Sequence, residues 1–179
     1  NKISKEYAGF RKFISDKSIH TNLAKYNQSN SKITPSWSAF PSGIRSAFYV
    51  AWDPQSLMSL KRNIKHINLV FPEWFFLDPK TGDLKTNVDP EGYKVLKKSG
   101  VSVMPILSNN FDREFRSEGL SKVLKDPKLR TQLIQKVTQQ CLKLHFKGVN
   151  IDFEDMNLDS DAPLIDFMKE LSLTFKQNN

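Results

Sequence analysis

The sequence has few of the residues and motifs that support several common kinds of protein chemistry. One cysteine, Cys141, occurs in 179 residues, so no internal disulfide can form. Its place in a helical pattern predicts a small buried apolar residue rather than a nucleophile. The three histidines lie far apart without metal-ligand spacing, and no glycine-rich phosphate loop occurs. Residues 155–161 resemble the start of a calcium loop but lack its glycine, and helix capping explains them better. We therefore expect no metal and no cofactor.

Long apolar runs are missing as well. The chain contains no stretch of 18 or more apolar residues and no leader with charged, apolar and small-residue parts. We therefore expect neither a membrane span nor an export signal within it. The composition is otherwise that of an ordinary globular protein, with 39% hydrophobic and 26% charged residues.

Positive charge is concentrated at the start of the chain. Residues 1–43 hold seven Lys or Arg against Glu6 and Asp16, a net charge of +5, which leaves +3 of the total +8 for the rest. Nucleic-acid binding would require basic residues interleaved with aromatic ones on one face, and we expect no nucleic-acid partner. The other interpretation is a solvated basic segment near a membrane surface.

The first 43 residues are predicted to be separate from the rest. Apolar residues at helical spacing predict a helix from residue 4 to about residue 25. Serine, asparagine and proline clusters then predict a linker over residues 27–43. We therefore divide the chain into an N-terminal helix with a basic linker, residues 1–43, and one domain, residues 44–179.

The domain consists of repeated strand and helix patterns. Such repeats imply parallel strands, because each helical crossover returns the next strand in the same direction. Asp-Pro pairs mark three of the helix starts, with Asp as the N-cap and Pro at the first helical position. Strands are expected at residues 45–52, 66–71, 101–107 and 149–154, and helices after Asp53-Pro54, Asp89-Pro90 and Asp126-Pro127 and from Asp161.

An α/β fold of parallel (β/α) units follows from these patterns. In a (β/α)8 barrel the carboxyl ends of all strands lie on one face, where active sites are found, and eight units take about 250 residues. About 135 residues follow the linker, enough for four units. The chain is therefore either the first half of a TIM-type (β/α)8 barrel, with the remainder beyond Asn179, or an open sheet. An isolated half would expose sheet edges, so we expect self-association.

The fourth predicted strand carries the strongest functional signal. Residues 149–154 alternate strictly, with Asn150, Asp152 and Glu154 on the polar side. Burying carboxylates in a row is costly unless each is paired, hydrated or neutralised, so their position at a strand end suggests chemistry. The other interpretation is a half-buried strand whose polar side meets solvent.

Residues 147–154, Lys-Gly-Val-Asn-Ile-Asp-Phe-Glu, resemble the strand-four signature D-G-x-D-x-D-x-E of family 18 glycoside hydrolases. Asp152 and Glu154 match its last two acids, whereas Lys147 and Asn150 replace the first two. The resemblance implies that Glu154 is the catalytic acid and Asp152 its partner. It also implies substrate-assisted, retaining hydrolysis of β-linked N-acetylglucosamine polymers. Because later strands of that family have no counterpart here, we expect the chain alone to be inactive.

Three further segments resemble a narrower group within this family. Residues 47–54, 71–76 and 104–109 are similar to the first three strand ends of a chitinase-like domain. That domain occurs in large bacterial proteins beside a polysaccharide deacetylase domain and a glycosyltransferase. The resemblance implies an extracytoplasmic place, tethered to the membrane through the parent protein, whose other domains would be partners. The alternative is a non-catalytic polysaccharide-binding module. The expected substrate contacts are Asn150, Tyr49, Trp52, Glu73, Trp74 and Asn109.

Overall fold

A computed structural model describes residues 43–178 of the chain. Residues from Ile44 onward form one compact unit, and the fold below is that of this unit alone. The helix predicted for residues 4–25 and nearly all of the linker lie outside the described residues. Within residues 43–178, no helix combines the length and the apolar character needed to cross a membrane.

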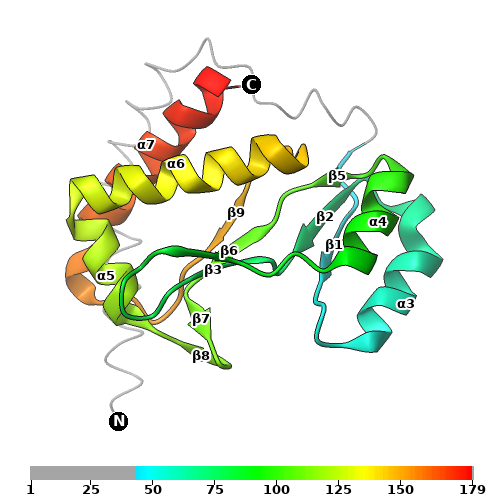
Figure 1. Cartoon of the computed structure of the whole chain (residues 1–179), viewed down its shortest axis with the longest axis horizontal. Helices are drawn as coiled ribbons and strands as arrows, with labels where there is room; N and C mark the ends of the chain where they lie inside the picture. The colour runs from blue at the N-terminus through cyan, green and yellow to red at the C-terminus, as the bar shows by residue number, and fades with distance from the viewer. Residues whose placement is uncertain (1–42, 179) are drawn as a thin grey trace. The chain divides into compact units, whose positions relative to one another are not determined.

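The main strands of the unit run parallel and follow one another in chain order (Figure 1). Strand β1 pairs with β2 and β2 with β5, while β3 pairs with β6 and β6 with β9. Antiparallel β4 lies along the other edge of β3, and β7 and β8 form a separate hairpin. The strands are β1 (Ser46–Tyr49), β2 (Leu69–Pro72), β3 (Phe75–Leu77), β4 (Leu84–Thr86), β5 (Ser102–Val103), β6 (Ile106–Ser108), β7 (Asn110–Phe111), β8 (Glu114–Phe115) and β9 (Asn150–Asp152).

The third predicted strand, residues 101–107, is divided into β5 and β6. The second, residues 66–71, corresponds to β2, and β3 follows it after a short break, outside the predicted strand. Backbone hydrogen bonds continue the pairing past the breaks, from Met104 N to Val70 O at 3.0 Å and from Asn150 N to Pro105 O at 2.9 Å. The result is four parallel strands side by side in sequence order, which confirms the predicted (β/α) half-barrel. The described residues form no closed barrel.

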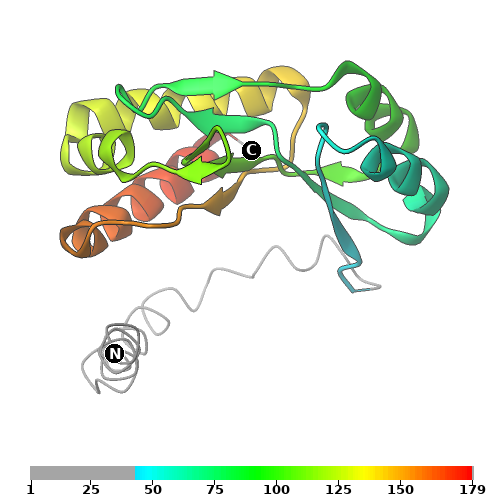
Figure 2. The same ribbon diagram turned by 90° about the horizontal axis from the view of Figure 1, so that it is seen from below.

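Helices begin where the Asp-Pro pairs predict. The side chains of Asp53, Asp89 and Asp126 each accept a backbone hydrogen bond from the first turn of the following helix. Gly100, with φ of +72°, ends α4 in the left-handed conformation that glycine adopts without strain. Figures 1 and 2 show α5, α6 and α7 at one end of the unit and α3 and α4 at the other. The helices are α3 (Pro54–Asn63), η2 (Ile64–His66), α4 (Pro90–Ser99), α5 (Ser117–Lys125), α6 (Pro127–Leu144), η3 (Leu158–Ser160) and α7 (Asp161–Asn178).

The core lies between the helices and one face of the strands. Val70, Leu107 and the ring of Phe75 are fully buried there, together with Cys141 from α6, as predicted. Burial raises the pKa of the Cys141 thiol to about 12, which keeps it protonated and unreactive. The opposite face of the strands carries a different set of side chains, because neighbours along a strand alternate between faces. The strand register places on this face Phe48 beside Phe71, Ile106 beside Asn150, and Phe76, Ser108 and Asp152 in one row.

Strand β3 lies in a stretch that was predicted to be a loop, and three further elements were missed from the sequence. The β7–β8 hairpin turns through Asp112 and Arg113, both with positive φ, although neither is a glycine that would have indicated such a turn. Strand β4 is short and pairs only at the edge of β3. Helix α5 had a usable signal, since Leu120, Val123 and Leu124 lie at helical spacing and are all buried.

Candidate active site at the carboxyl end of the fourth strand

The carboxylate pair lies where the fourth parallel strand ends. Asp152 is the last residue of β9 and stands opposite Ser108 of β6. Ile151 and Phe153 pack on the core, with the Phe153 ring 5.7 Å from that of Phe167 in α7. Asp152, which neighbours Ile151 in β9, therefore points to the other side, and Glu154 follows two residues beyond the end of the strand. Asp152 is partly buried and Glu154 is exposed.

The backbone of Glu154 is held on both sides by one buried side chain. Asn109, only 1% exposed, donates from Nδ2 to the Glu154 carbonyl oxygen at 2.8 Å and accepts at Oδ1 from the Glu154 amide at 2.9 Å. It also donates to the carbonyl oxygen of Arg116 at 3.2 Å. Asp155, with φ of +50°, then turns the chain away. Asn109 thus positions Glu154, and its buried amide is not offered to a ligand as the sequence had suggested.

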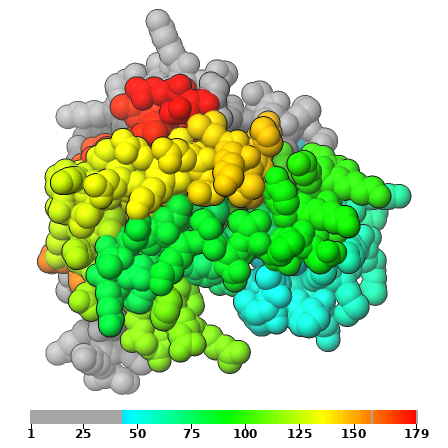
Figure 3. Space-filling model, viewed as in Figure 1, coloured from blue at the N-terminus to red at the C-terminus, as the bar shows by residue number. Residues whose placement is uncertain are grey.

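The same residue connects the site to the β7–β8 hairpin. Arg116, just after β8, donates its backbone amide to the Asn109 carbonyl oxygen at 3.0 Å. The hairpin projects from the surface of the unit (Figure 3). A hollow of about 500 Å³ opens between its side chains Phe111 and Phe115 and the turn at Pro79 and Lys80. An open hollow with aromatic walls beside the hairpin is therefore available to a ligand.

Two predicted substrate contacts are core residues in this structure. Trp74 is 0% and Tyr49 2% exposed, and their rings meet edge to face at 6.2 Å. The Tyr49 hydroxyl donates to the carboxylate of Asp89, which also caps α4 through the amide of Gly92. Burial raises the pKa of Tyr49 well above its ordinary value, and the bond to Asp89 raises it further. A Cβ at position 92 would lie 2.5 Å from the Tyr49 ring. Neither ring presents a face to solvent on which a sugar could stack.

Trp52 and Glu73 form a second, separate polar pair. Trp52 is 74% exposed, and its Nε1 donates to the Glu73 carboxylate at 2.9 Å. Glu73 precedes by three residues the position, Phe76, that stands in the same row as Asp152. Glu73 itself lies at the bend between β2 and β3, outside both strands.

The structure also describes Asn150, the last predicted substrate contact, and the segment 155–161 that resembles a calcium loop. Asn150 is partly buried on the same face as Asp152, two residues before it along β9. In the part of the chain that the structure describes, no group of three or more His, Cys, Asp or Glu side chains is arranged to hold a metal ion. Asp159 pairs with Lys125 at 2.6 Å, and Asp161 begins α7.

This arrangement defines the class of site. It is an acid pair at the carboxyl end of a parallel strand, where half-barrel folds place their chemistry. The two carboxylates come from one strand end, two residues apart, rather than from two different strands on either side of a cleft. One exposed acid with a fixed backbone can deliver a proton, and its partly buried neighbour can orient a bound group.

Comparison with known proteins places the fold among chitinases and spore cortex-lytic enzymes. The sequence matches no model of a protein family and no curated protein. The fold is similar to the spore cortex-lytic enzyme SleL of Bacillus cereus, with a TM-score of 0.65 and 16% identity over 73% of this chain and 32% of that one. A class V chitinase from Pseudomonas fluorescens gives a TM-score of 0.66 and 19% identity over 70% of this chain and 39% of that one.

A third solved structure similar to this chain contains a bound sugar. Catalytic domain 2 of the Group II chitinase of Ostrinia furnacalis, in mutant form, was solved in complex with penta-N-acetylchitooctaose. It has a TM-score of 0.61 and 17% identity over 74% of this chain and 40% of that one. The chain thus spans between a third and two fifths of the length of these three proteins. The described unit has a chitinase-like fold over the matched part of these proteins.

Proposed function

We propose that residues 44–179 belong to a chitinase-like glycoside hydrolase domain that acts on β-linked N-acetylglucosamine polymers. One observation carries the proposal: Asp152 ends the fourth parallel strand of a chitinase-like fold, Glu154 follows two residues later, and Asn109 holds the backbone of Glu154 on both sides. The resemblance of residues 147–154 to the family 18 signature assigns the acid and its partner to the same two residues. Family 18 enzymes use a substrate-assisted route.

The proposed reaction uses one acid and the substrate's own acetamide. Glu154 gives its proton to the glycosidic oxygen as the bond from that oxygen to the anomeric carbon breaks. The 2-acetamido carbonyl oxygen bonds to the anomeric carbon from the other face. Asp152 accepts a hydrogen bond from the acetamide N–H and stabilises the positive cyclic ion. Water then opens this ion while the Glu154 carboxylate takes a proton from it, which restores both groups and retains the configuration.

Substrate contacts beyond the acids are proposed where side chains are accessible. Asn150 lies on the same face as Asp152 and can add a hydrogen bond. Trp52, 74% exposed and held by Glu73, can stack on a sugar ring farther along the polymer. The hollow beside Phe111 offers another position. The chito-oligosaccharide bound to the Ostrinia furnacalis domain supports this choice of polymer.

The complete site is proposed to belong to the whole protein. The described unit supplies four parallel strands, whereas a (β/α)8 barrel has eight. We propose that the remaining strands complete the cleft, and that this chain alone does not hydrolyse polymer. An extracytoplasmic place in a membrane-tethered parent, beside deacetylase and glycosyltransferase domains, is part of the same proposal.

A binding module without hydrolysis is the second candidate. The observation that favours it is the substitution of two signature acids, by Asn150 on β9 and by Lys147 before it. Without those acids no proton can pass along the strand toward Glu154. In this alternative the same cleft holds an acetylated polysaccharide for a neighbouring deacetylase or glycosyltransferase domain.

The test is release of reducing ends from chitin oligosaccharides by the full-length protein. Glu154→Gln should lower the rate by about a hundredfold or more, because it removes the proton donor, and should leave oligosaccharide binding nearly unchanged. Glu91→Gln, at an exposed position in the first turn of α4 and outside the proposed substrate contacts, is the matched control and should keep full activity. Hydrolysis that survives Glu154→Gln would show that the acid is another residue. Binding without any hydrolysis by the unaltered protein would favour the binding module.

A further inference from the structure

The end of the unit opposite the acid pair is strongly basic. In parallel (β/α) units, the carboxyl ends of the helices and the starts of the strands lie together at one end. The upper end of α4, the right-hand end of α6 and the start of β5 meet in this way in Figure 1. We call this end the basic face and define it by its cationic residues Lys61, Arg62, Lys65, His66, Lys97, Lys98, Lys143, His145 and Lys147.

No acid offsets this charge within the segments that build the basic face. Residues 61–68, 97–103 and 143–149 contain no Asp or Glu. None of the seven Lys and Arg of the basic face takes part in an ion pair with a residue that the structure describes. The helix dipole favours lysines in the last turns of α3, α4 and α6. It does not explain Lys147, which lies outside any helix, so the charge exceeds what helix stability accounts for.

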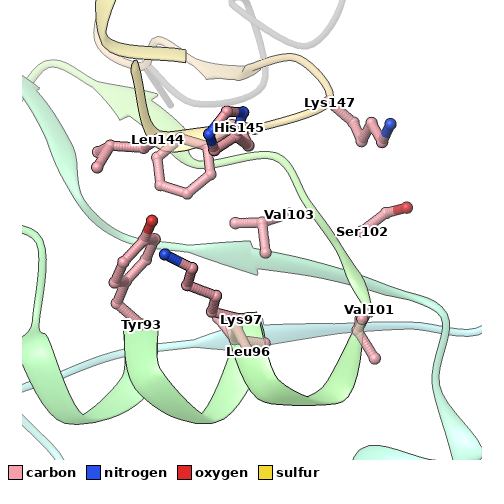
Figure 4. Close-up of a pocket in the computed structure, with 11 residues that line it drawn as sticks. Tyr93, Leu96, Lys97, Val101, Ser102, Val103, Leu144, His145 and Lys147 are labelled. Atoms are coloured by element: carbon pink, nitrogen blue, oxygen red, sulfur yellow. The ribbon is translucent and has the colours of Figure 1, made fainter. Parts of the chain in front are cut away.

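A pocket lies in the middle of this basic face. It has a volume of about 210 Å³ and sits between the carboxyl ends of α4 and α6. Its floor is apolar, formed by Leu96, Val103 and Phe146, and its rim carries Lys97 and Lys147. Figure 4 shows Lys97 reaching from α4 toward the segment after α6, while the amine of Lys147 points away from the pocket. The Lys97 amine lies 5.8 Å from the centre of the Tyr93 ring. An apolar pocket flanked by lysines matches a membrane surface, where anionic head groups lie above the hydrocarbon of the lipid chains.

We propose that the basic face docks this unit onto a membrane surface that contains anionic phospholipid. Charge complementarity carries the choice, because clustered Lys and Arg are attracted to the phosphate groups of such a surface. Two exposed apolar side chains, Ile44 before β1 and Leu142 beside Lys143, flank the cations and can enter the interfacial region. Docked in this way, the unit points Asp152 and Glu154 away from the membrane. The proposal does not depend on what those acids do.

A nucleic acid is the less suitable partner for the same charge. Single strands are bound by aromatic side chains interleaved with cations. The exposed aromatic residues of the described part of the chain, Phe48, Trp52 and Phe111, all lie outside the basic face. The basic face is made of helix ends and strand starts, and no helix or ribbon projects from it to enter a groove of a duplex.

The test is co-sedimentation of the full chain with vesicles. Vesicles of equal parts phosphatidylglycerol and phosphatidylcholine should bind it, vesicles of phosphatidylcholine alone should not, and added salt should release it. The variant K97Q/K98Q/K147Q removes three charges from the basic face and should bind at least about tenfold more weakly. The matched control K122Q/K128Q/K169Q removes three exposed charges from α5, α6 and α7 and should bind within about twofold of the unaltered chain. Both variants keep the basic segment 1–43.

Four outcomes would overturn the proposal. The first is that the unaltered chain does not bind the anionic vesicles. The second is that the two variants lose binding equally, which would assign the attraction to net charge alone. The third is that the K97Q/K98Q/K147Q variant binds like the unaltered chain, which would assign it to residues 1–43. The fourth is tighter binding to duplex DNA than to the vesicles at equal salt, which would make nucleic acid the partner.

Discussion

At the scale of single residues, the site depends on an amide that the sequence presented as a ligand contact. Asn109 follows a buried strand and is polar, which is the usual pattern of a residue that faces a cleft. In the structure its three hydrogen bonds are all to backbone atoms, of Glu154 and Arg116. A strand-end asparagine can face a ligand or hold a neighbouring loop. The outcome depends on the distance from its side chain to the loop after the next strand, and the sequence alone does not give that distance.

Replacing Asn109 tests this positioning role. Asn109→Ala should destabilise the chain by about 1–3 kcal/mol, because buried hydrogen bonds to the backbone are lost. It should also speed hydrogen exchange of the Glu154 amide, which then lacks its acceptor. Urea unfolding gives the first quantity and NMR-detected exchange the second. Asn110→Ala is the control, because no hydrogen bond of the Asn110 side chain is recorded, and equal exchange at Glu154 in both variants would contradict the assignment.

Tyr49 and Trp74 show the same limit of the sequence for aromatic residues. An aromatic ring at a strand end can stack on a sugar or fill the core, and the local pattern is identical in both cases. The register decides: Tyr49 and Pro72 are partners, and their side of the sheet faces α4. Trp52 lies beyond the end of β1 and remains exposed. Of the predicted aromatic contacts, only Trp52 is accessible to a ligand.

At the scale of elements, α6 and α7 are joined by an ion pair between a buried arginine and a partly exposed glutamate. Arg130 of α6 is 7% exposed and donates to both carboxylate oxygens of Glu170 in α7, at 3.0 and 2.7 Å. It also donates to the carbonyl oxygen of Leu124 in α5 at 2.7 Å. One guanidinium therefore connects three helices. The bond to Glu170 raises the pKa of Arg130, so it stays charged.

Removing this guanidinium should destabilise the chain strongly. Arg130→Ala should cost about 3 kcal/mol, because the buried guanidinium is lost and the Leu124 carbonyl oxygen and the Glu170 carboxylate lose their donors. Arg130→Lys should cost less, since it keeps the charge but loses the fork that binds both oxygens. Urea unfolding followed by circular dichroism measures both, with Lys128→Ala on the exposed side of α6 expected within about 0.5 kcal/mol of the parent. A cost for Arg130→Ala no larger than that control would show that the pair contributes little.

The elements themselves were predicted well where capping chemistry is local. Each Asp-Pro pair supplies an N-cap acceptor and a fixed φ, so helix starts are set by neighbouring residues alone. Strand lengths were predicted less well, because strands end where their neighbours diverge. Strand partners change at the breaks after Pro72 and after Val103. Before the breaks β2 lies between β1 and β5, and after them β3 and β6 pair with each other and with β4 and β9.

At the scale of the whole described unit, both outer parallel strands have an unpaired edge. Within residues 43–178, β1 pairs only with β2, and β9 only with β6. Phe48 on β1 is 71% exposed, with its ring 5.5 Å from that of Phe71. Unpaired edges beside exposed aromatic rings favour association with another strand.

We therefore expect the chain to self-associate at high concentration. Phe48→Lys should shift the sedimentation profile toward monomer, because a charge at the edge opposes strand pairing. Met58→Lys is the control, because it also replaces an apolar side chain by a charged one, but in α3 and away from the sheet edge. Met58 is 57% exposed, and its replacement should leave the sedimentation profile unchanged. Analytical ultracentrifugation over a range of concentrations makes the comparison. A monomer at all concentrations, or equal effects of the two variants, would contradict edge pairing.

The sequence by itself determined the parallel (β/α) order, the helix starts and the acid row of the fourth strand. These features depend on periodicity and on helix capping, and both involve residues that are close together in the chain. A short stretch of sequence is therefore enough to predict them. Only the tertiary structure decided that Asn109 holds Glu154, that Tyr49 and Trp74 are core residues, and that the cations of three helix ends form one basic face. Each of these depends on contacts between residues distant in sequence, and strand register and packing alone establish such contacts.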